Sequence, residues 1–172
     1  MAKTLILGIG NVLLSDDGAG VHVARLLAQR LAGREDVEVL DGGTLSFTLA
    51  PLIAGCTRLI VLDATELERE PGTVRTFIGA EFDSLLGRPR LTVHEIGLRD
   101  VLAISELAGE LPPERALVAI QPASLGWGTE CTAEVASALR YAVDNVLQLL
   151  RSQAWQDTSG DDAGVDANPR AA

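Results

Sequence analysis

Three short runs dominated by apolar residues constrain the fold of this chain more than any other feature of its sequence. They span residues 4–8 (TLILG), 58–63 (RLIVLD) and 116–120 (ALVAI), and each stops at or just before a glycine or a polar residue. Strands that are apolar on both faces are typical of parallel sheets with helices packed against each side. The sequence therefore predicts a buried sheet with helices on both sides.

Helical patterns separate these runs, because apolar residues recur there at a spacing near 3.6 residues. The predicted helices span residues 19–32, 45–54, 97–107 and 132–150. Thr44 and Thr132 are candidate N-caps of the second and the fourth of these helices. Pro51 is expected to shorten or kink the second helix, since a proline inside a helix costs about 3 kcal/mol.

Two further strands are predicted at residues 37–40 and 73–78, where apolar and polar residues alternate. Only nine residues, 64–72, separate the strand at 58–63 from the one at 73–78. A parallel crossover needs about a dozen residues or more, so the strand at 73–78 is expected to be antiparallel and to lie at a sheet edge. Strands and helices otherwise alternate, which predicts an α/β fold with a mostly parallel sheet.

Length and composition indicate one domain followed by a tail. A chain of 172 residues is one domain by the usual relation between length and domain number, and residues 1–151 are expected to form it. Residues 152–172 are rich in Ala, Asp, Gly and Ser and contain one aromatic residue. Such a segment has too little apolar surface to offset its ordering entropy, so it is expected to be a disordered acidic tail.

Charge and composition argue against several classes of partner. Acidic residues outnumber basic ones by 24 to 14, the net charge is −10, and Lys3 is the only lysine. A chain of this charge is not expected to bind nucleic acid or an anionic membrane. No apolar run of about 18 residues is present to span a bilayer. Cys56 and Cys131 match no metal or redox spacing and, without a secretory signal, indicate reduced thiols in a cytoplasmic protein.

Acidic residues follow the predicted strands where ligands bind in open α/β sheets, beyond the carboxyl ends. Asp16 and Asp17 follow the first strand, Asp41 the second and Asp63 the third, and His94 lies in a loop from which it can reach the same edge. A lone aspartate after a strand is most often a helix N-cap, which fits the first three better than Asp63 because no helix follows it. Two carboxylates with an imidazole are also a plausible ligand group for a divalent transition metal.

The string GIGN raises a different possibility, a dinucleotide-binding loop. The fingerprint G-x-G-x-x-G would need a glycine at Leu13, and the acid expected about 20 residues further on would have to be Asp41, 31 residues beyond Gly10. Asp16 and Asp17 would also repel a pyrophosphate. The sequence therefore disfavours nucleotide binding and leaves it as an alternative.

Several strings, taken in order, resemble the hydrogenase maturation endopeptidases. They are GIGNVLLSDDGAGVHVA, VLDGGT, LIVLDAT followed by PGT, HEIGL and AIQP, and they span residues 5–122. The elements GxGN-x4-D-[DE]-x2-G and DGGT together are the most specific of these. The resemblance implies a compact three-layer α/β/α fold with a five-stranded twisted sheet, in agreement with the pattern of strands and helices.

The same resemblance implies an activity. Members of this family remove a short C-terminal extension from the large-subunit precursor of nickel–iron hydrogenase after its metal centre is loaded, and the bound nickel is thought to be part of what they recognise. Their metal-binding acid, central-strand aspartate and histidine fall here on Asp17, Asp63 and His94, the implied catalytic and metal-binding residues. Nickel is expected to arrive with the substrate, and another divalent transition ion can occupy the site in vitro.

The mechanism stays open between two chemistries. Nickel contacted by the three residues can act as a Lewis acid that activates water, or Asp17 or its neighbour Asp16 can act as general base while the metal positions the bond. A non-enzymatic nickel-binding checkpoint or metallochaperone would use the same residues. The candidate substrate-binding residues at this edge are Asp16, Asp41, Gly42, Gly43, Thr44 and Gln121.

Overall fold

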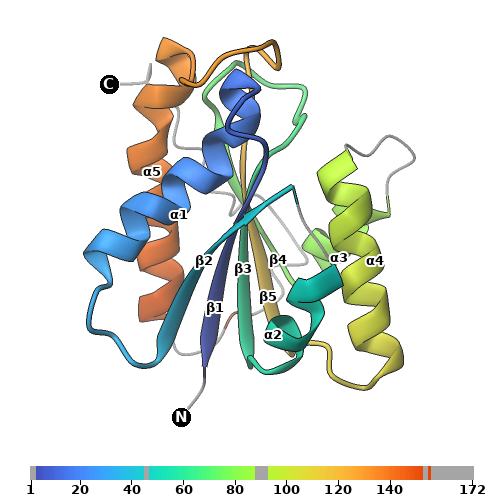
Figure 1. Ribbon diagram of the computed structural model, residues 1–172. Helices are drawn as coiled ribbons and strands as arrows, with labels where there is room; N and C mark the ends of the chain where they lie inside the picture. The colour runs from blue at the N-terminus through green and yellow to red at the C-terminus, as the bar shows by residue number, and fades with distance from the viewer. Residues whose placement is uncertain (1–2, 45–46, 88–92, 153–154, 156–172) are drawn as a thin grey trace.

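The computed structural model describes residues 3–44, 47–87, 93–152 and 155, and of residues 47 and 93–96 it describes the backbone alone. Its centre is a five-stranded sheet between layers of helices (Figure 1). Four strands are parallel to one another, and β4 is antiparallel to its neighbour β5, which confirms the predicted α/β fold with one antiparallel edge strand. In spatial order the strands are β2 (Val37–Gly43), β1 (Thr4–Ile9), β3 (Arg58–Ala64), β5 (Glu114–Ile120) and β4 (Val74–Ile78).

Helices cover both faces of the sheet. The helices α1 (Ala19–Arg30) and α5 (Ala133–Arg151) pack against each other on one face. The other face carries α2 (Ala50–Ala54), α3 (Ala80–Leu86) and α4 (Val93–Leu107), as Figure 1 shows. Short 3-10 turns, η1 (Ser15–Gly18) and η2 (Phe47–Leu49), lead into α1 and α2.

Alternation along the central strands divides the core into two parts. Ile6 of β1, with Ile60 and Leu62 of β3, packs against α1 and α5. Leu7 and Val61, the intervening residues, pack against α2, α3 and α4. All five are fully buried, and each such side chain stabilises the fold by about 1.5–3 kcal/mol. The loops at the carboxyl edge of the sheet are therefore carried by well-packed supports.

Glycines allow α1 to lie very close to the sheet. A Cβ atom on Gly20 would lie 2.1 Å from the carbonyl oxygen of Leu62 and 2.5 Å from that of Ile9. A Cβ atom on Gly8 would lie 2.5 Å from the carbonyl oxygen of Gly20. Only glycine fits both positions, so the start of α1 lies against the carboxyl ends of β1 and β3.

The helix predicted over residues 45–54 is short, as the proline at position 51 led us to expect. α2 begins at Ala50, and Pro51 lies in its first turn. A proline is tolerated there because the first N–H groups of a helix have no partner within it. Leu49 occupies the N-cap position, so Thr44 does not cap this helix.

Two features of the segment between β4 and β5 differ from expectation. The seven-residue helix α3 was not predicted, because so short a helix shows no clear period; Gly79, with a φ of +52°, turns the chain into it. α4 begins at Val93 rather than at residue 97, so His94 lies in the first helical turn and not in a loop.

Trp155 attaches the C-terminal segment to the body of the protein. Its ring lies 4.3 Å from the guanidinium carbon of Arg58, and its Nε1–H donates to the carbonyl of Leu149 at 3.0 Å. Arg58 also donates to the carbonyl of Ser152 at 3.0 Å. Trp155, which belongs to the predicted tail, thus contacts the body of the protein, and the rest of the predicted tail lies outside the described residues.

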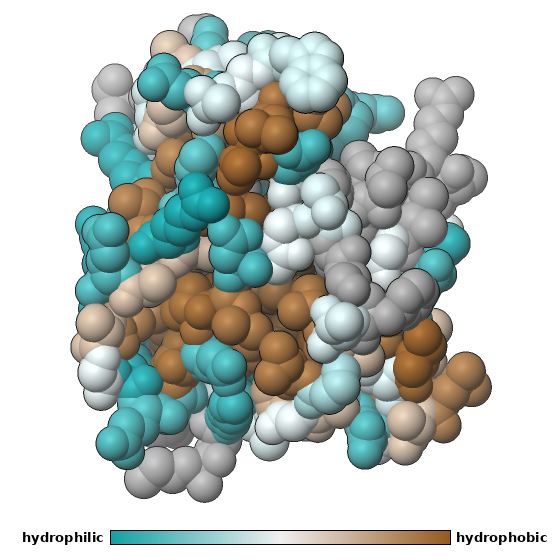
Figure 2. Space-filling view, viewed as in Figure 1, coloured by the Kyte–Doolittle hydropathy of each residue, from teal (hydrophilic) through white to brown (hydrophobic). Residues whose placement is uncertain are grey.

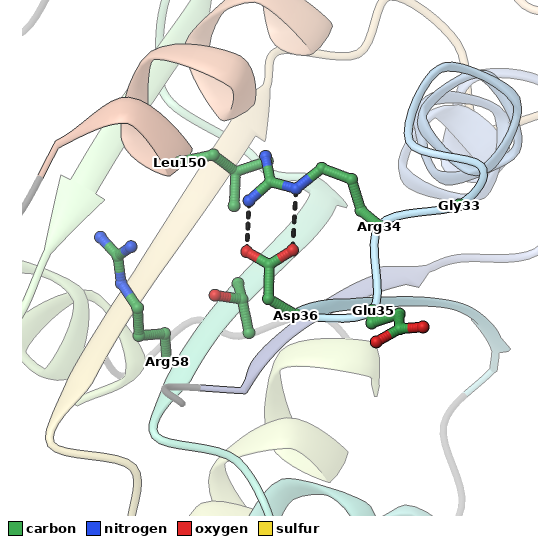
Figure 3. Close-up of a pocket in the computed structure, with 7 residues that line it drawn as sticks. Gly33, Arg34, Glu35, Asp36, Arg58 and Leu150 are labelled. Atoms are coloured by element: carbon green, nitrogen blue, oxygen red, sulfur yellow. Dashed lines mark hydrogen bonds and ion pairs between the residues drawn. The ribbon is translucent and has the colours of Figure 1, made fainter.

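A cavity of about 730 Å³ opens beside this attachment, at the amino end of the sheet (Figure 3). Arg34 and Asp36 are paired by two hydrogen bonds at its wall, and Thr4 and Arg58 begin β1 and β3. The candidate site residues follow the opposite ends of these strands. The cavity is thus remote from them.

Candidate active site

The loop from Gly10 to Gly18 carries the first two candidate carboxylates and is tightly wound. Gly10 has a φ of +133°, and a Cβ atom there would lie 1.9 Å from the carbonyl oxygen of Asp17. Ser15 has a φ of +50°, a conformation uncommon for any residue other than glycine. The chain's own backbone fills the space beside Gly10, so the packing of the loop accounts for this glycine without a bound pyrophosphate.

Asp17 is buried, and it does not cap α1. Its Oδ2 accepts a hydrogen bond from the N–H of Asn11 at 2.9 Å. The N-cap position belongs to Gly18, without a side-chain hydrogen bond, so the capping interpretation of this aspartate is wrong. Asn11 was absent from the predicted site residues, although the last letter of the GxGN string marks it. Its Oδ1 accepts the N–H of Leu13 at 3.0 Å and thereby fixes the turn.

Asp63 is also buried and lies beside the same loop. Successive side chains of β3 point to opposite faces of the sheet, so Asp63 lies on the same face as Leu59 and Val61. This face is covered by α2, α3 and α4. The carbonyl of the preceding residue, Leu62, touches Gly20, which comes three residues after Asp17. η1 packs against β3 accordingly. The fold thus brings Asp17 and Asp63 to one part of the carboxyl edge.

His94 comes from the layer of helices that Asp63 faces. Its backbone lies in the first turn of α4. Its side chain lies outside the described part of the structure, which therefore gives no distance from the imidazole to either carboxylate. Among the side chains that are described, no three from His, Cys, Asp and Glu lie close enough to hold a metal ion.

Asp16 has a different environment from its neighbour. It is completely buried, and its Oδ2 accepts the N–H groups of Ala123 and Ser124, both at 2.9 Å. Its Oδ1 accepts the N–H of Thr132 at 2.7 Å, and the Thr132 hydroxyl donates to Oδ2 at 2.9 Å. The hydrogen bonds from these four donors hold the loop before α5 against the loop after β1. The carboxylate is occupied in this way, which favours a structural role over that of a general base.

Gln121 supports the neighbouring loop. It is buried, and its Oε1 accepts the N–H groups of Leu67 at 2.7 Å and Arg69 at 3.3 Å. Its own backbone N–H donates to the carbonyl of Thr73 at 2.9 Å. The side chain therefore holds the connection between β3 and β4 in place.

The DGGT turn at the end of β2 is tied to the loop that carries Asp17. The carbonyl of Gly43 accepts the N–H of Gly10 at 2.7 Å, and Asp41 Oδ1 accepts the N–H of Gly43 at 3.1 Å. Gly42 lies in a bulge, since β1 pairs with the residues on either side of it. Asp41 and Thr44 are exposed at this edge.

The two cysteines are free thiols with little nucleophilic character. Burial raises the pKa of Cys56 to about 11, and burial with the nearby Asp16 carboxylate raises the pKa of Cys131 to about 11. Both are protonated near neutral pH, so neither supplies the thiolate that a cysteine protease needs.

The fold and the edge described above define a small α/β protein in which two buried aspartates, Asp17 and Asp63, lie at the carboxyl edge of the sheet. A family model described as hydrogenase maturation protease matches residues 21–149. The chain belongs to the hydrogenase maturation protease family, as its sequence motifs indicated.

Two relatives support this assignment. The hydrogenase 2 maturation protease of Escherichia coli strain K12 is 34% identical over 171 residues, which cover 99% of this chain and 98% of that protein. The hydrogenase expression/formation protein HupD of Rhodobacter capsulatus is 33% identical over 159 residues, or 92% of this chain and 76% of that protein.

A solved structure agrees. The hydrogenase maturating endopeptidase HybD from Escherichia coli superposes with a TM-score of 0.82 at 35% identity, over 87% of this chain and 92% of that one. The protein is a peptidase, which decides against the non-enzymatic checkpoint. Among the described residues, no helix is long and apolar enough to cross a membrane.

Proposed function

We propose that this peptidase removes a C-terminal extension from the large-subunit precursor of a nickel–iron hydrogenase after metal insertion, and that it recognises the nickel in that precursor. The observation that carries the proposal is that two buried carboxylates, Asp17 and Asp63, lie at one part of the carboxyl edge, on elements that contact each other. One solved relative is the [NiFe] hydrogenase maturation protease HybD from Thermococcus kodakarensis, which is 31% identical with a TM-score of 0.73, over 86% of this chain and 98% of that one.

The chemistry of the donor set fits a nickel-bearing substrate. Asp17 and Asp63, together with His94, supply two carboxylates and one imidazole, and imidazole and carboxylate are both ligands for divalent transition metals. Asp17 and Asp63 are both buried at this edge of the sheet. A nickel ion delivered by the precursor would approach both. Another divalent transition ion can take its place in vitro.

We propose Asp17 as the residue that accepts a proton from the attacking water. When the water oxygen adds to the peptide carbonyl carbon, it loses a proton, and the departing amine must gain one. The Asp17 carboxylate can take the first proton and return it to the nitrogen as the C–N bond breaks. Asp16 is not used in this scheme, because four donors occupy its carboxylate.

The DGGT turn is the proposed support for the extension that is removed. Residues 41–44 lie at the end of β2, and the carbonyl of Gly43 accepts a hydrogen bond from Gly10 of the loop that carries Asp17.

Two free thiols, Cys56 and Cys131, are consistent with processing in the reducing cytoplasm, where we place the reaction.

Incubation of the protein with nickel-loaded and with nickel-free large-subunit precursor tests this function, with cleavage read as a loss of mass. The proposal predicts that the loaded precursor alone is cut. Equal cutting of both precursors would contradict the recognition of nickel. Intact loaded precursor after long incubation would contradict the substrate assignment.

A further inference from the structure

We propose that Leu13, Leu125 and Trp127, here called the apolar rim, are the surface on which the folded hydrogenase precursor docks. This inference rests on the proposed function and adds a binding surface to it. The three residues lie in the two loops that Asp16 joins, next to the candidate active site. Leu125 and Trp127 lie outside the sequence motifs that carry the family resemblance, and Leu13 occupies one of the four unspecified positions of the element GxGN-x4-D-[DE]-x2-G.

The apolar rim is exposed and free of charge in an otherwise charged protein. Leu13 is 51% exposed, Leu125 is 50% exposed and Trp127 is 86% exposed. The segments that carry them, residues 10–15 and 122–129, contain no charged residue, although the chain has 24 acidic and 14 basic residues. Figure 2 shows hydrophobic and weakly polar surface together near the top of the molecule, above the carboxyl edge. Exposed apolar surface of this kind commonly marks a protein–protein contact.

The backbone beneath the apolar rim is held firmly. Leu14 and Gly128 form a parallel bridge between the two loops. The N–H of Ser15 donates to the carbonyl of Gly128 at 2.8 Å, and the N–H of Gly128 donates to the carbonyl of Leu13 at 3.0 Å. The Ser15 hydroxyl donates to the carbonyl of Glu130 at 3.0 Å. A partner that binds here therefore meets loops that are already in place, and little ordering entropy is lost on binding.

The position of the apolar rim argues for the substrate as its occupant. Leu13 and Asp17 belong to one loop, and Asn11 is bonded to both of them. A precursor that places its scissile peptide bond beside Asp17 must also cover this loop. Its folded body, rather than the extension alone, can then contribute apolar surface to the complex. Trp127 is the kind of large aromatic residue that supplies much of the binding energy in such contacts.

Two other occupants fit the observations less well. A second copy of this chain seated on the apolar rim would cover the loop that carries Asp17 and would obstruct the reaction. A membrane surface is disfavoured by the net charge of −10, because anionic headgroups would repel the protein. The folded precursor is therefore the occupant that fits the apolar rim best.

The test compares the double variant Leu13→Ser/Trp127→Ala with the wild-type protein on nickel-loaded large-subunit precursor. KM is expected to rise at least tenfold while kcat stays within twofold, because the rim binds the precursor and does not touch the reacting atoms. The melting temperature is expected to stay unchanged, since both side chains are exposed. Leu107→Ala is the matched control. Leu107 is 90% exposed, but it is the last residue of α4 and lies at the opposite end of the molecule from the apolar rim. The KM of the Leu107→Ala variant should therefore equal that of the wild type.

Binding to the precursor, followed by calorimetry, separates this inference from the proposed function. At least tenfold weaker binding by the double variant supports the apolar rim, whether or not cleavage is seen. Equal KM and equal affinity in the double variant and the wild type would overturn it. A wild-type dimer in sedimentation that the double variant abolishes would also overturn it, because the occupant would then be a second copy.

Discussion

Asp16 and Thr132, 116 residues apart in the chain, are joined by hydrogen bonds from both the backbone N–H and the hydroxyl of Thr132 to the Asp16 carboxylate. The pair fixes the start of α5 to the loop after β1. Asp17, the next residue, is the one that the fold brings towards Asp63. Two consecutive aspartates thus serve different purposes, one as a structural support and one in the proposed chemistry.

The first prediction concerns this support. Asp16→Asn is expected to lower the free energy of unfolding by about 3 kcal/mol, because an amide cannot accept from all four donors and hydrogen bonds to a charged group contribute about 1.5–3 kcal/mol each. Urea unfolding measures the change. Asp144→Asn, at an exposed acid of α5, is the control and should alter the stability by less than about 0.5 kcal/mol. Equal stability of the two variants would count against the structural role of Asp16.

A second prediction concerns the close contact between α1 and the sheet. Gly20→Ala is expected to cost about 2 kcal/mol or more, since the new Cβ atom would lie 2.1 Å from the Leu62 carbonyl oxygen and α1 would have to shift. Gly55→Ala is the matched control, because its Cβ atom meets nothing nearer than 3.5 Å and its φ of −81° suits alanine. Denaturant melts that showed equal costs would contradict the packing described for α1.

Trp155 provides a third prediction. Trp155→Ala is expected to lower the free energy of unfolding by about 2 kcal/mol, through loss of its contact with Arg58 and its hydrogen bond to Leu149. Removal of residues 156–172 is expected to leave the stability unchanged, given their polar and acidic composition. Thermal melts of the two variants test this contrast. A truncated protein that melted as low as Trp155→Ala would show that later residues also contribute.

The strands could be predicted from the sequence because their physics is local. The runs at 4–8, 58–63 and 116–120 are too apolar to lie anywhere but in a buried sheet, and nine linking residues are too few for a parallel crossover. The same reasoning predicted that Asp17 and Asp63 lie at the carboxyl edge, since Asp17 comes after the first strand and Asp63 at the end of the third. It could not separate Asp16 from Asp17, because the donors that occupy Asp16 come from residues 123–132, far along the chain.

The first residue of a helix is harder to predict from the sequence than the helix itself, and the cause is physical. The sequence pattern places Pro51 inside a helix that starts at residue 45, because no local signal shows that α2 begins at Ala50. The attachment of Trp155 depends on Arg58, and the sequence around Trp155 alone has the composition of a tail. Long-range contacts decide both cases.

His22 gives a prediction for pH. Burial, followed by the nearby Arg25, lowers the pKa of His22 below its ordinary value of 6.5, while Asp41 opposes the change. The unfolded chain therefore takes up this proton at a higher pH than the folded protein does. The contribution to stability is fully present above pH 6.5 and is lost as the pH falls from there through the folded pKa.

His22→Gln removes this titration and should lose less stability than the wild type between about pH 7 and pH 5. Urea unfolding at a series of pH values measures the difference, and His94 is present in both proteins. Parallel stability curves for the two proteins would contradict the assignment to His22.

The most direct test of the account is cleavage of nickel-loaded large-subunit precursor by Asp17→Asn and Asp63→Asn, read as loss of mass, with Asp144→Asn as control and circular dichroism melts of every variant. Each substitution keeps the side-chain size and removes the charge, and an amide can neither accept the proton from water nor replace an anionic metal ligand. Both site variants are expected to stay folded and to leave the precursor uncut, whereas Asp144→Asn is expected to cut it at the wild-type rate. Full cleavage by folded Asp17→Asn or Asp63→Asn would contradict this expectation.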